Sequence, residues 1–183
     1  YPEQALQRSH EARALAQELS HSYSLGFALQ HTALLHEYRR EARRVQEIAE
    51  ITIQLAQEHG FVQWLAGGTV ERGWALVEQG FIEEGMEQLQ HGMTIWQRLG
   101  TELGHTHTLF RLAQIHRRAG QTKEGLSLLE GAIAIIHDRD ERHYETEIYR
   151  LKGELLLAQE GQWHKVEEAE IAGERLPELF EVR

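Results

Sequence analysis

The sequence contains no cysteine and no asparagine. The first absence excludes disulfide bonds, thiolate metal sites and a cysteine nucleophile, and the second excludes N-linked glycosylation. No run of about 18 apolar residues occurs, so the sequence predicts no membrane span. The polar stretch at the N-terminus lacks the pattern of a signal peptide. These absences favour a cytoplasmic protein.

Positive charge is also scarce. The chain has 19 lysines and arginines against 29 aspartates and glutamates, which gives a net charge of −10. A negative surface opposes direct binding to nucleic acid, because such binding needs basic patches. The chain begins at Tyr1 without a methionine, and Pro2 sits at a plausible first helical position. We therefore expect a fragment of a larger protein.

Only two prolines occur, and strand-like alternation is absent. Apolar residues recur with helical spacing along almost the whole chain, which predicts an all-α protein. We expect about nine helices, separated by short turns that make neighbours antiparallel. Their expected ranges are 2–19, 22–39, 42–59, 62–79, 82–99, 104–119, 122–138, 142–160 and 163–180.

Glycine recurs at a fixed spacing: Gly60, Gly80, Gly100 and Gly120 fall every 20 residues, and Gly161 follows one residue late. Such recurrence is typical of stacked repeats. Each turn glycine suits the left-handed position that ends a helix. The remaining breaks are expected around residues 20, 40 and 140.

Other small residues lie inside the expected helices, and they recur after 40 residues: Gly85 and Gly92, then Gly125 and Ala132. An interior glycine costs a helix about 1 kcal/mol relative to alanine. That cost is offset if the missing side chain lets two helix axes approach closely. We therefore interpret these residues as contact points between stacked helices.

The order of small and large residues resembles the tetratricopeptide repeat, in which a mid-helix small residue and a turn glycine precede two further small residues. The matching residues are Gly73, Leu76, Gly80, Gly85, Leu89 and Gly92; then Ala113, His116, Gly120, Gly125, Leu129 and Ala132; and, more loosely, Ala33, His36, Arg40, Val45, Ala49 and Thr52.

The two ends of the chain also carry parts of the pattern. Ala5 and Ala12 fit an opening half repeat, and Gly153 takes the small site of the last repeat. The resemblance divides the chain into a half repeat over 1–20 and repeats over about 21–60, 61–100, 101–140 and 141–183. Gly173, Leu176 and Pro177 depart from the pattern, and Pro177 is expected to kink or end the last helix.

The repeat length of 40 is longer than the 34 of ordinary tetratricopeptide repeats and on length alone favours HEAT or armadillo repeats. The small-residue pattern and the equal helix lengths favour the long tetratricopeptide-like arrays instead. The segments "ERGWALVEQG" and "YRLKGELLLAQEG" resemble arrays that follow an ATPase module in MalT-type transcriptional regulators and in bacterial nucleotide cyclases. The resemblance implies a right-handed superhelix of helical hairpins.

No residue set predicts catalysis, a metal site or a cofactor. His31 and His36 are spaced five apart, so they diverge on a helix, and His105 and His107 lack a third ligand. The "DRDE" stretch at 138–141 lacks the glycine of a calcium loop. "LAGGTVERG" has the wrong spacing for a phosphate-binding loop. The two aspartates sit together and the serines are few and scattered, so no catalytic triad is indicated.

The basic cluster at Arg39, Arg40, Arg43 and Arg44 surrounds one expected turn. It could receive an acidic partner or a phosphate. The interpretation that we favour is a solvated corner, balanced by neighbouring glutamates.

Two functions remain open. The first is a non-catalytic protein-interaction module, whose partner is a protein, a peptide or another domain of the same chain. The resemblance implies a groove lined by the first helix of each hairpin, which gives these candidates: Gln30, Leu34, Tyr38, Val70, Trp74, Phe110, Gln114, Arg117, Arg118, Arg150 and Glu154. Aromatic–arginine mixtures of this kind are typical of interface hot spots.

The second is an intramolecular spacer or dimerisation scaffold for an attached catalytic or DNA-binding domain. The first helix has no preceding partner, so we expect its apolar residues to support self-association. These are Leu6, Ala12, Leu15 and Leu19.

Overall fold

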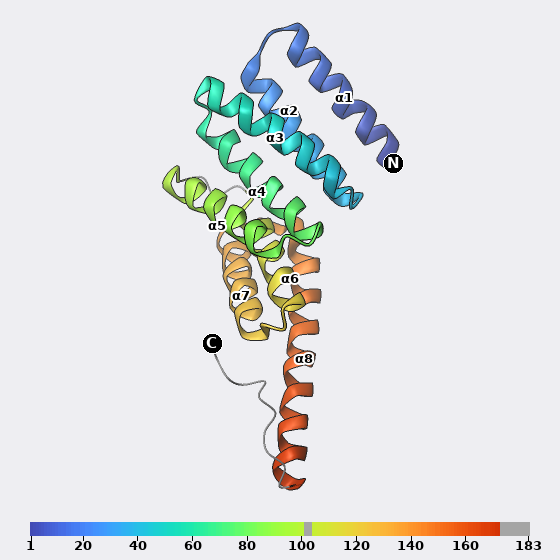
Figure 1. Ribbon diagram of the computed structural model, residues 1–183, viewed down its shortest axis with the longest axis vertical. Helices are drawn as coiled ribbons and strands as arrows, with labels where there is room; N and C mark the ends of the chain where they lie inside the picture. Colours follow the sequence, from blue (N-terminus) through green and yellow to red (C-terminus); the bar gives the residue numbers. More distant parts are fainter. Residues whose placement is uncertain (101–103, 173–183) are drawn as a thin grey trace. The chain divides into compact units, whose positions relative to one another are not determined.

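A computed structural model describes residues 1–100 and 104–172, and for Pro2 and residues 162–172 it describes the backbone alone. The described residues are helical, with short turns and no strand (Figure 1). None of their helices is long and apolar enough to cross a membrane. The elements are α1 (Pro2–Glu18), α2 (Ser22–Tyr38), α3 (Ala42–His59), α4 (Val62–Glu78), α5 (Ile82–Arg98), α6 (His105–Arg118), α7 (Thr122–Arg139), the short 3-10 helix η1 (Arg142–Tyr144) and α8 (Glu145–Ala172).

The chain divides into two compact units, Tyr1–Thr108 and Leu109–Arg183. The all-α class and the run of helical hairpins are confirmed. That both units belong to one continuous array with a right-handed superhelical path stays a prediction. In the first unit, consecutive helices from α1 to α5 pack on one another, and α2 also packs on α4.

The turns follow the 20-residue spacing. Positive φ angles occur at Gly60, Gly80, Gly100 and Gly120, and also at Ser20, Arg40 and Asp140, where φ is 51°, 58° and 57°. The seven turns therefore use the left-handed conformation whether or not glycine is present. At Gly80, the Phe81 N–H donates to the carbonyl of Leu76 at 3.0 Å, which closes the end of α4.

The glycines inside α4 and α5 bring the two backbones into contact. A Cβ added at Gly73 would lie 2.7 Å from the Gly85 carbonyl oxygen, and one added at Gly92 would lie 2.8 Å from that of Ala66. Real Cβ atoms almost never come this close, so both positions require glycine. The predicted packing role is confirmed here.

Because of this close approach, α4 is buried between α3 and α5 (Figure 1). Residues 66–71 and 73–77 are all buried. A helix that is buried around its circumference is expected to be apolar or small on every side. The segments "AGGTV" and "GWALV" meet that expectation, and the buried Glu71 between them is the exception.

The second unit has its own core, in which α6, α7 and α8 meet. Its buried members are Phe110, Ala113, Leu129, Ala132, Ile136, Ile148, Leu151 and Leu155. Gly125 of α7 lies over α6, where an added Cβ would be 3.5 Å from the Ala113 carbonyl oxygen. This contact is looser than those between α4 and α5.

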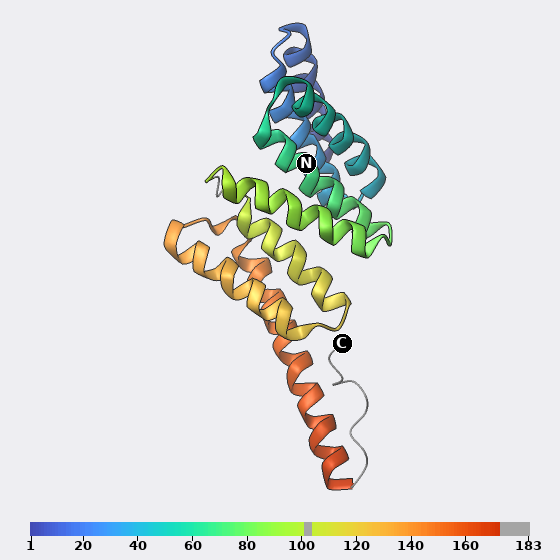
Figure 2. The same ribbon diagram turned by 60° about the vertical axis from the view of Figure 1, so that its left-hand side comes forward.

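The expected break at Gly161 is absent. Helix α8 runs from Glu145 to Ala172 without interruption, and both views show it as one helix (Figures 1 and 2). A glycine alone weakens a helix without ending it, and its neighbours here are good helix formers. The small site expected at Gly153 is also unused, since a Cβ there would meet no atom of the described residues within 4 Å. Gly173, Leu176 and Pro177 lie outside the described residues.

We expect Gly92→Leu to destabilise the protein by about 1–3 kcal/mol, because the larger side chain overpacks the contact between α4 and α5. Urea denaturation measures the effect. Gly131→Ala is the matched control: Gly131 is exposed in mid-helix, with only ordinary contact available to a Cβ. It should raise stability by up to about 1 kcal/mol. An unchanged midpoint for Gly92→Leu would show that this glycine is not at a contact.

Candidate binding surface

One side of α2 presents large side chains to solvent. Tyr23, Phe27 and Tyr38 are exposed by 45%, 54% and 53% of their areas. His31 is exposed between them, and Leu34 is half-buried. Their spacings of four, four, three and four residues place them along one face of a helix. We call these five residues the α2 stripe.

The first half of the stripe is held in place by aromatic rings of the next hairpin. The Tyr23 ring lies edge-on to Phe61, with centroids 5.2 Å apart, and 5.1 Å from the ring of Trp64. The Phe27 ring lies 6.0 Å from the Trp64 ring. Gly26 makes room for this cluster, since a Cβ there would lie 2.5 Å from Cδ1 of Trp64. Tyr23 and Phe27 are therefore held against the ring of Trp64.

Further along, Gln30 closes the space between α2 and α4. Its Nε2 donates to Oε1 of Glu71 at 3.0 Å, and its side chain covers Gly67 so closely that a Cβ there would overlap it. Burial raises the pKa of Glu71 to about 8, because the ionised carboxylate would lose its hydration.

A second buried polar contact joins α2 to the start of α6. Nε2 of His107 lies 3.1 Å from Oε1 of Glu37. Burial lowers the pKa of His107 to about 3, so at neutral pH an uncharged imidazole donates to the Glu37 carboxylate. This contact is therefore a hydrogen bond within the first unit and not an ion pair.

The predicted groove wall on α4 is not open. Val70 and Trp74 are buried, and Nε2 of Gln30 donates its hydrogen bond to Glu71. The cause is that α3 and α5, as well as α2, pack on α4: a Cβ added at Gly92 of α5, for example, would lie 2.5 Å from Cγ2 of Val70. Of the candidates in the first unit, Leu34 and Tyr38 lie on the α2 stripe.

The candidates in the second unit are divided between its core and its charged surface. Phe110 is a core residue and lies 5.8 Å from the Tyr144 ring. Gln114 is half-buried, and Arg118 is exposed. Arg117 pairs with Glu154 at 3.5 Å, and Arg150 pairs with Glu147 and Glu154. These arginines are thus neutralised by carboxylates of α8 and do not form an uncompensated basic patch.

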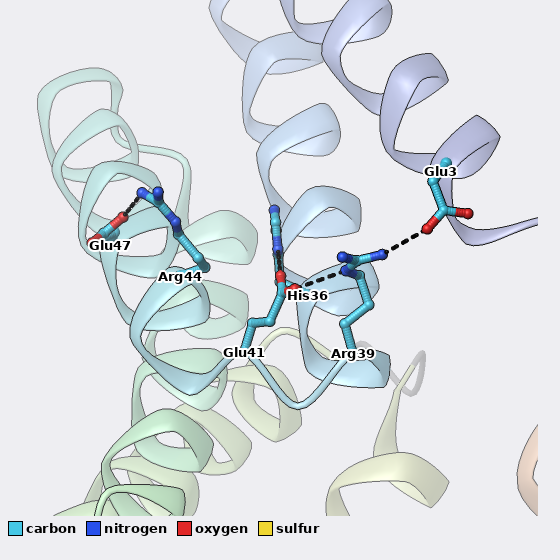
Figure 3. A network of polar contacts seen from close by, with 6 residues as sticks. All are labelled: Glu3, His36, Arg39, Glu41, Arg44 and Glu47. Atoms are coloured by element: carbon cyan, nitrogen blue, oxygen red, sulfur yellow. Dashed lines mark hydrogen bonds and ion pairs between the residues drawn. The ribbon is translucent and has the colours of Figure 1, made fainter.

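In the basic corner between α2 and α3, glutamates balance Arg39 and Arg44 (Figure 3). Arg39 donates to Glu41 at 2.9 Å and lies 3.5 Å from Glu3 of α1. His36 Nδ1 donates to the other oxygen of Glu41 at 2.5 Å. Hydrogen bonds from His36 and Arg39 hold the pKa of Glu41 below its ordinary value. Arg44 pairs with Glu47 at 2.7 Å.

The depression between α3, α4 and α5 is lined by apolar side chains, such as Ile53 and Leu65, as well as by polar ones. Arg72 on α4 lies 3.2 Å from Glu84 and 3.8 Å from Glu50. Its charge is satisfied by these two carboxylates, so the depression offers no free cation to a ligand.

His31 makes contacts within its own helix. Nδ1 of His31 donates to the Phe27 carbonyl at 2.9 Å, and its ring lies 4.1 Å from that of Phe27. Within the described ranges, no three His, Cys, Asp or Glu side chains are grouped so that they could hold a metal ion.

Sequence reasoning missed Tyr23, Phe27 and His31. The candidates expected on α2 were Gln30, Leu34 and Tyr38, which lie in the middle and at the end of that helix. A search for aromatic residues spaced three or four apart on one helix would have found these three, since the signal is present in "YSLGFALQHTALLHEY".

Comparison of the chain with protein-family models, with curated proteins and with solved structures gives no match. The description of its surfaces therefore depends on the geometry alone.

We expect Glu71→Gln to change how stability depends on pH. A raised pKa means that the stabilisation from the protonated carboxyl is complete below about 4.5 and is lost as the pH rises through about 8. The lowered pKa of His107 makes stability depend on pH only below about pH 6.5, the ordinary pKa of histidine. Between about pH 6.5 and about pH 8, the free energy of unfolding should therefore fall more steeply in the natural protein than in Glu71→Gln.

Urea denaturation at the two pH values measures this difference. Glu87→Gln, which changes an exposed glutamate of the neighbouring α5, is the control and should keep the steeper slope. Equal slopes for the natural protein and Glu71→Gln would contradict the assignment.

Proposed function

We propose that this chain is a non-catalytic protein-interaction module and that the α2 stripe is its binding face. The observation that supports this most is the exposure of three large aromatic side chains on one side of one helix. Exposed apolar patches of this kind mark interaction sites on soluble proteins, and tyrosine is among the residues most enriched in hot spots.

The contacts of two stripe residues with Trp64 favour binding energetically. Tyr23 and Phe27 pack on Trp64, so little side-chain freedom remains to be lost when a partner covers them. Burial of further aromatic surface contributes about 25 cal/mol per Å². A stripe of this length on α2 spans about 22 Å, since each helical residue rises about 1.5 Å.

The kind of partner follows from this shape and chemistry. An amphipathic helix of about 15 residues would match the stripe, with apolar residues spaced three or four apart. Near Tyr38, a depression lined by Tyr1, Ala5, Leu6 and Leu35 could receive one anchoring side chain. The partner is a separate protein or another domain of the same chain. The resemblance stated above suggests a bacterial signalling or transcription-regulating ATPase as the larger protein.

The alternative is an intramolecular spacer or dimerisation scaffold. It is favoured by the exposure of Leu15 and Leu19 on α1, at 55% and 67%. In that case the apolar surface of α1, and not the α2 stripe, would carry the interaction.

A peptide selection tests the proposal. Peptides of about 15 residues displayed on phage would be selected against the folded chain, and their affinities measured by fluorescence anisotropy. A double variant, Phe27→Ser with Tyr38→Ser, should weaken the selected peptides at least tenfold, because each change removes an aromatic contact worth about 1 kcal/mol or more. Circular dichroism would check that the variant remains folded.

Phe81→Ser is the matched control. Phe81 is an aromatic residue with 58% exposure at the N-terminus of α5, outside the stripe. Peptides should bind this variant as they bind the natural protein. Selected peptides that lose affinity for Phe81→Ser but not for the double variant would refute the assignment of the face.

A further inference from the structure

The two ends of the α2 stripe differ in charge. From residue 14 to residue 71, lysine and arginine occur only in the basic corner that follows Tyr38, the last residue of the stripe. The four residues concerned are Arg39, Arg40, Arg43 and Arg44. Helix α2 itself has neither lysine nor arginine, so the basic charge lies beyond one end of the stripe.

Two of these arginines are neutralised and two are not. Arg39 and Arg44 pair with glutamates (Figure 3). Arg40 lies in the turn, and Arg43 lies in the first turn of α3. Both are exposed, and neither side chain forms an ion pair or a hydrogen bond with another described residue. The corner therefore presents two open guanidinium groups to a ligand.

Exposed carboxylates lie at the opposite end of the stripe. Glu18 is the last residue of α1, and a short turn separates it from Tyr23 at the start of α2. Glu58 of α3 lies shortly before Phe61, whose ring contacts that of Tyr23. Both glutamates are exposed, and neither forms an ion pair with another described residue. The stripe thus runs from an acidic end to a basic end.

We propose that the partner helix carries acidic residues at its N-terminal end and lies antiparallel to α2, so that its carboxylates meet Arg40 and Arg43. Acidic side chains are favoured in the first turn of a helix and basic ones in the last turn, because they complement the helix dipole. A partner with this common distribution of charge matches both ends of the stripe only when it runs antiparallel. The inference rests on the proposed function and adds the charge and the direction of the partner.

The chemistry of the corner favours carboxylates as its ligands. A guanidinium group presents a planar fork of donors that fits a carboxylate in two parallel hydrogen bonds. Nucleic acid is disfavoured, because only two such groups are open on a chain whose net charge is −10. Charges at the rim of an interface affect specificity and salt dependence more than total affinity. The aromatic residues therefore supply most of the binding energy, and the two arginines set the direction.

The selected peptides that depend on Phe27 and Tyr38 test the charge of the partner. We expect their acidic residues to gather at the N-terminal end. Arg40→Gln with Arg43→Gln should weaken them about threefold or more at about 0.05 M salt, and much less at about 0.5 M salt, where exposed charges are screened. A peptide whose N-terminal acidic residues are changed to amides should lose as much affinity for the natural chain, and little more for this double variant.

Arg98→Gln with Lys123→Gln is the matched control. These residues of α5 and α7 are also exposed and also form no ion pair with a described residue, so the control removes the same charge outside the corner. The peptides should bind it as they bind the natural chain. Circular dichroism would check that both double variants are folded.

A spin label tests the direction of the partner. The chain has no cysteine, so a nitroxide can be attached to a cysteine added at the N-terminus of a selected peptide without labelling the protein. In nuclear magnetic resonance spectra of the complex, the label should broaden the amide signal of Arg40 more than that of Ser24, which lies at the other end of α2.

The outcomes separate this inference from the proposed function. Stronger broadening of Ser24 than of Arg40 would overturn the inferred direction. Equal affinity for the natural chain and the Arg40, Arg43 variant at low salt, or an equal loss in the control, would overturn the inferred charge. Each of these results leaves the stripe as the binding face. Selected peptides that do not depend on Phe27 and Tyr38 would overturn both proposals.

Discussion

The contact between the backbones of α4 and α5 is the constraint on which the first unit depends. Gly73, Gly85 and Gly92 let the two helices approach until carbonyl oxygens occupy the space of the missing side chains. Each glycine costs its helix about 1 kcal/mol, and close packing of the surrounding apolar side chains offsets that cost. Since α3 covers the other side of α4, this helix becomes the buried centre of the unit.

The exposed surfaces follow from that arrangement. With α4 buried, α2 packs directly against it and fills the space between them with Gln30, Glu71 and the Trp64 cluster. Tyr23 and Phe27 of α2 pack on Trp64 of α4 and remain partly exposed to solvent, as does Tyr38 at the other end of the helix. The candidate binding face therefore lies on α2, and the buried carboxyl of Glu71 is a consequence of the same packing.

Much of this arrangement could be predicted from the sequence, because it depends on local backbone chemistry. The 20-residue spacing of turns, the left-handed residues and the tight glycines of α5 are all visible in the order of the residues. At the basic corner, the expected balance by nearby glutamates is found for Arg39 and Arg44, which pair with Glu41 and Glu47.

What could not be predicted depends on contacts between distant residues. Trp74 and Phe110 have the same sequence signature whether they face a groove or a core, and only the packing of neighbouring helices decides between the two. Gly161 shows the complementary case: its place in the repeat predicted a turn, but the local sequence continues as a helix. The candidates expected on α2 began at Gln30, and so Phe27, which lies earlier on the same helix, was missed.

Hydroxyl-radical footprinting of the free chain, read by mass spectrometry, tests the central claim most directly, because it compares side-chain accessibility residue by residue. If α2 presents the open face and α4 is closed, then Tyr23, Phe27 and Tyr38 should be oxidised rapidly. Trp74 and Phe110, which are buried, should be protected despite the high intrinsic reactivity of aromatic rings. Oxidation of Trp74 as fast as that of Tyr38 would contradict the account, because it would show that an open groove runs along α4.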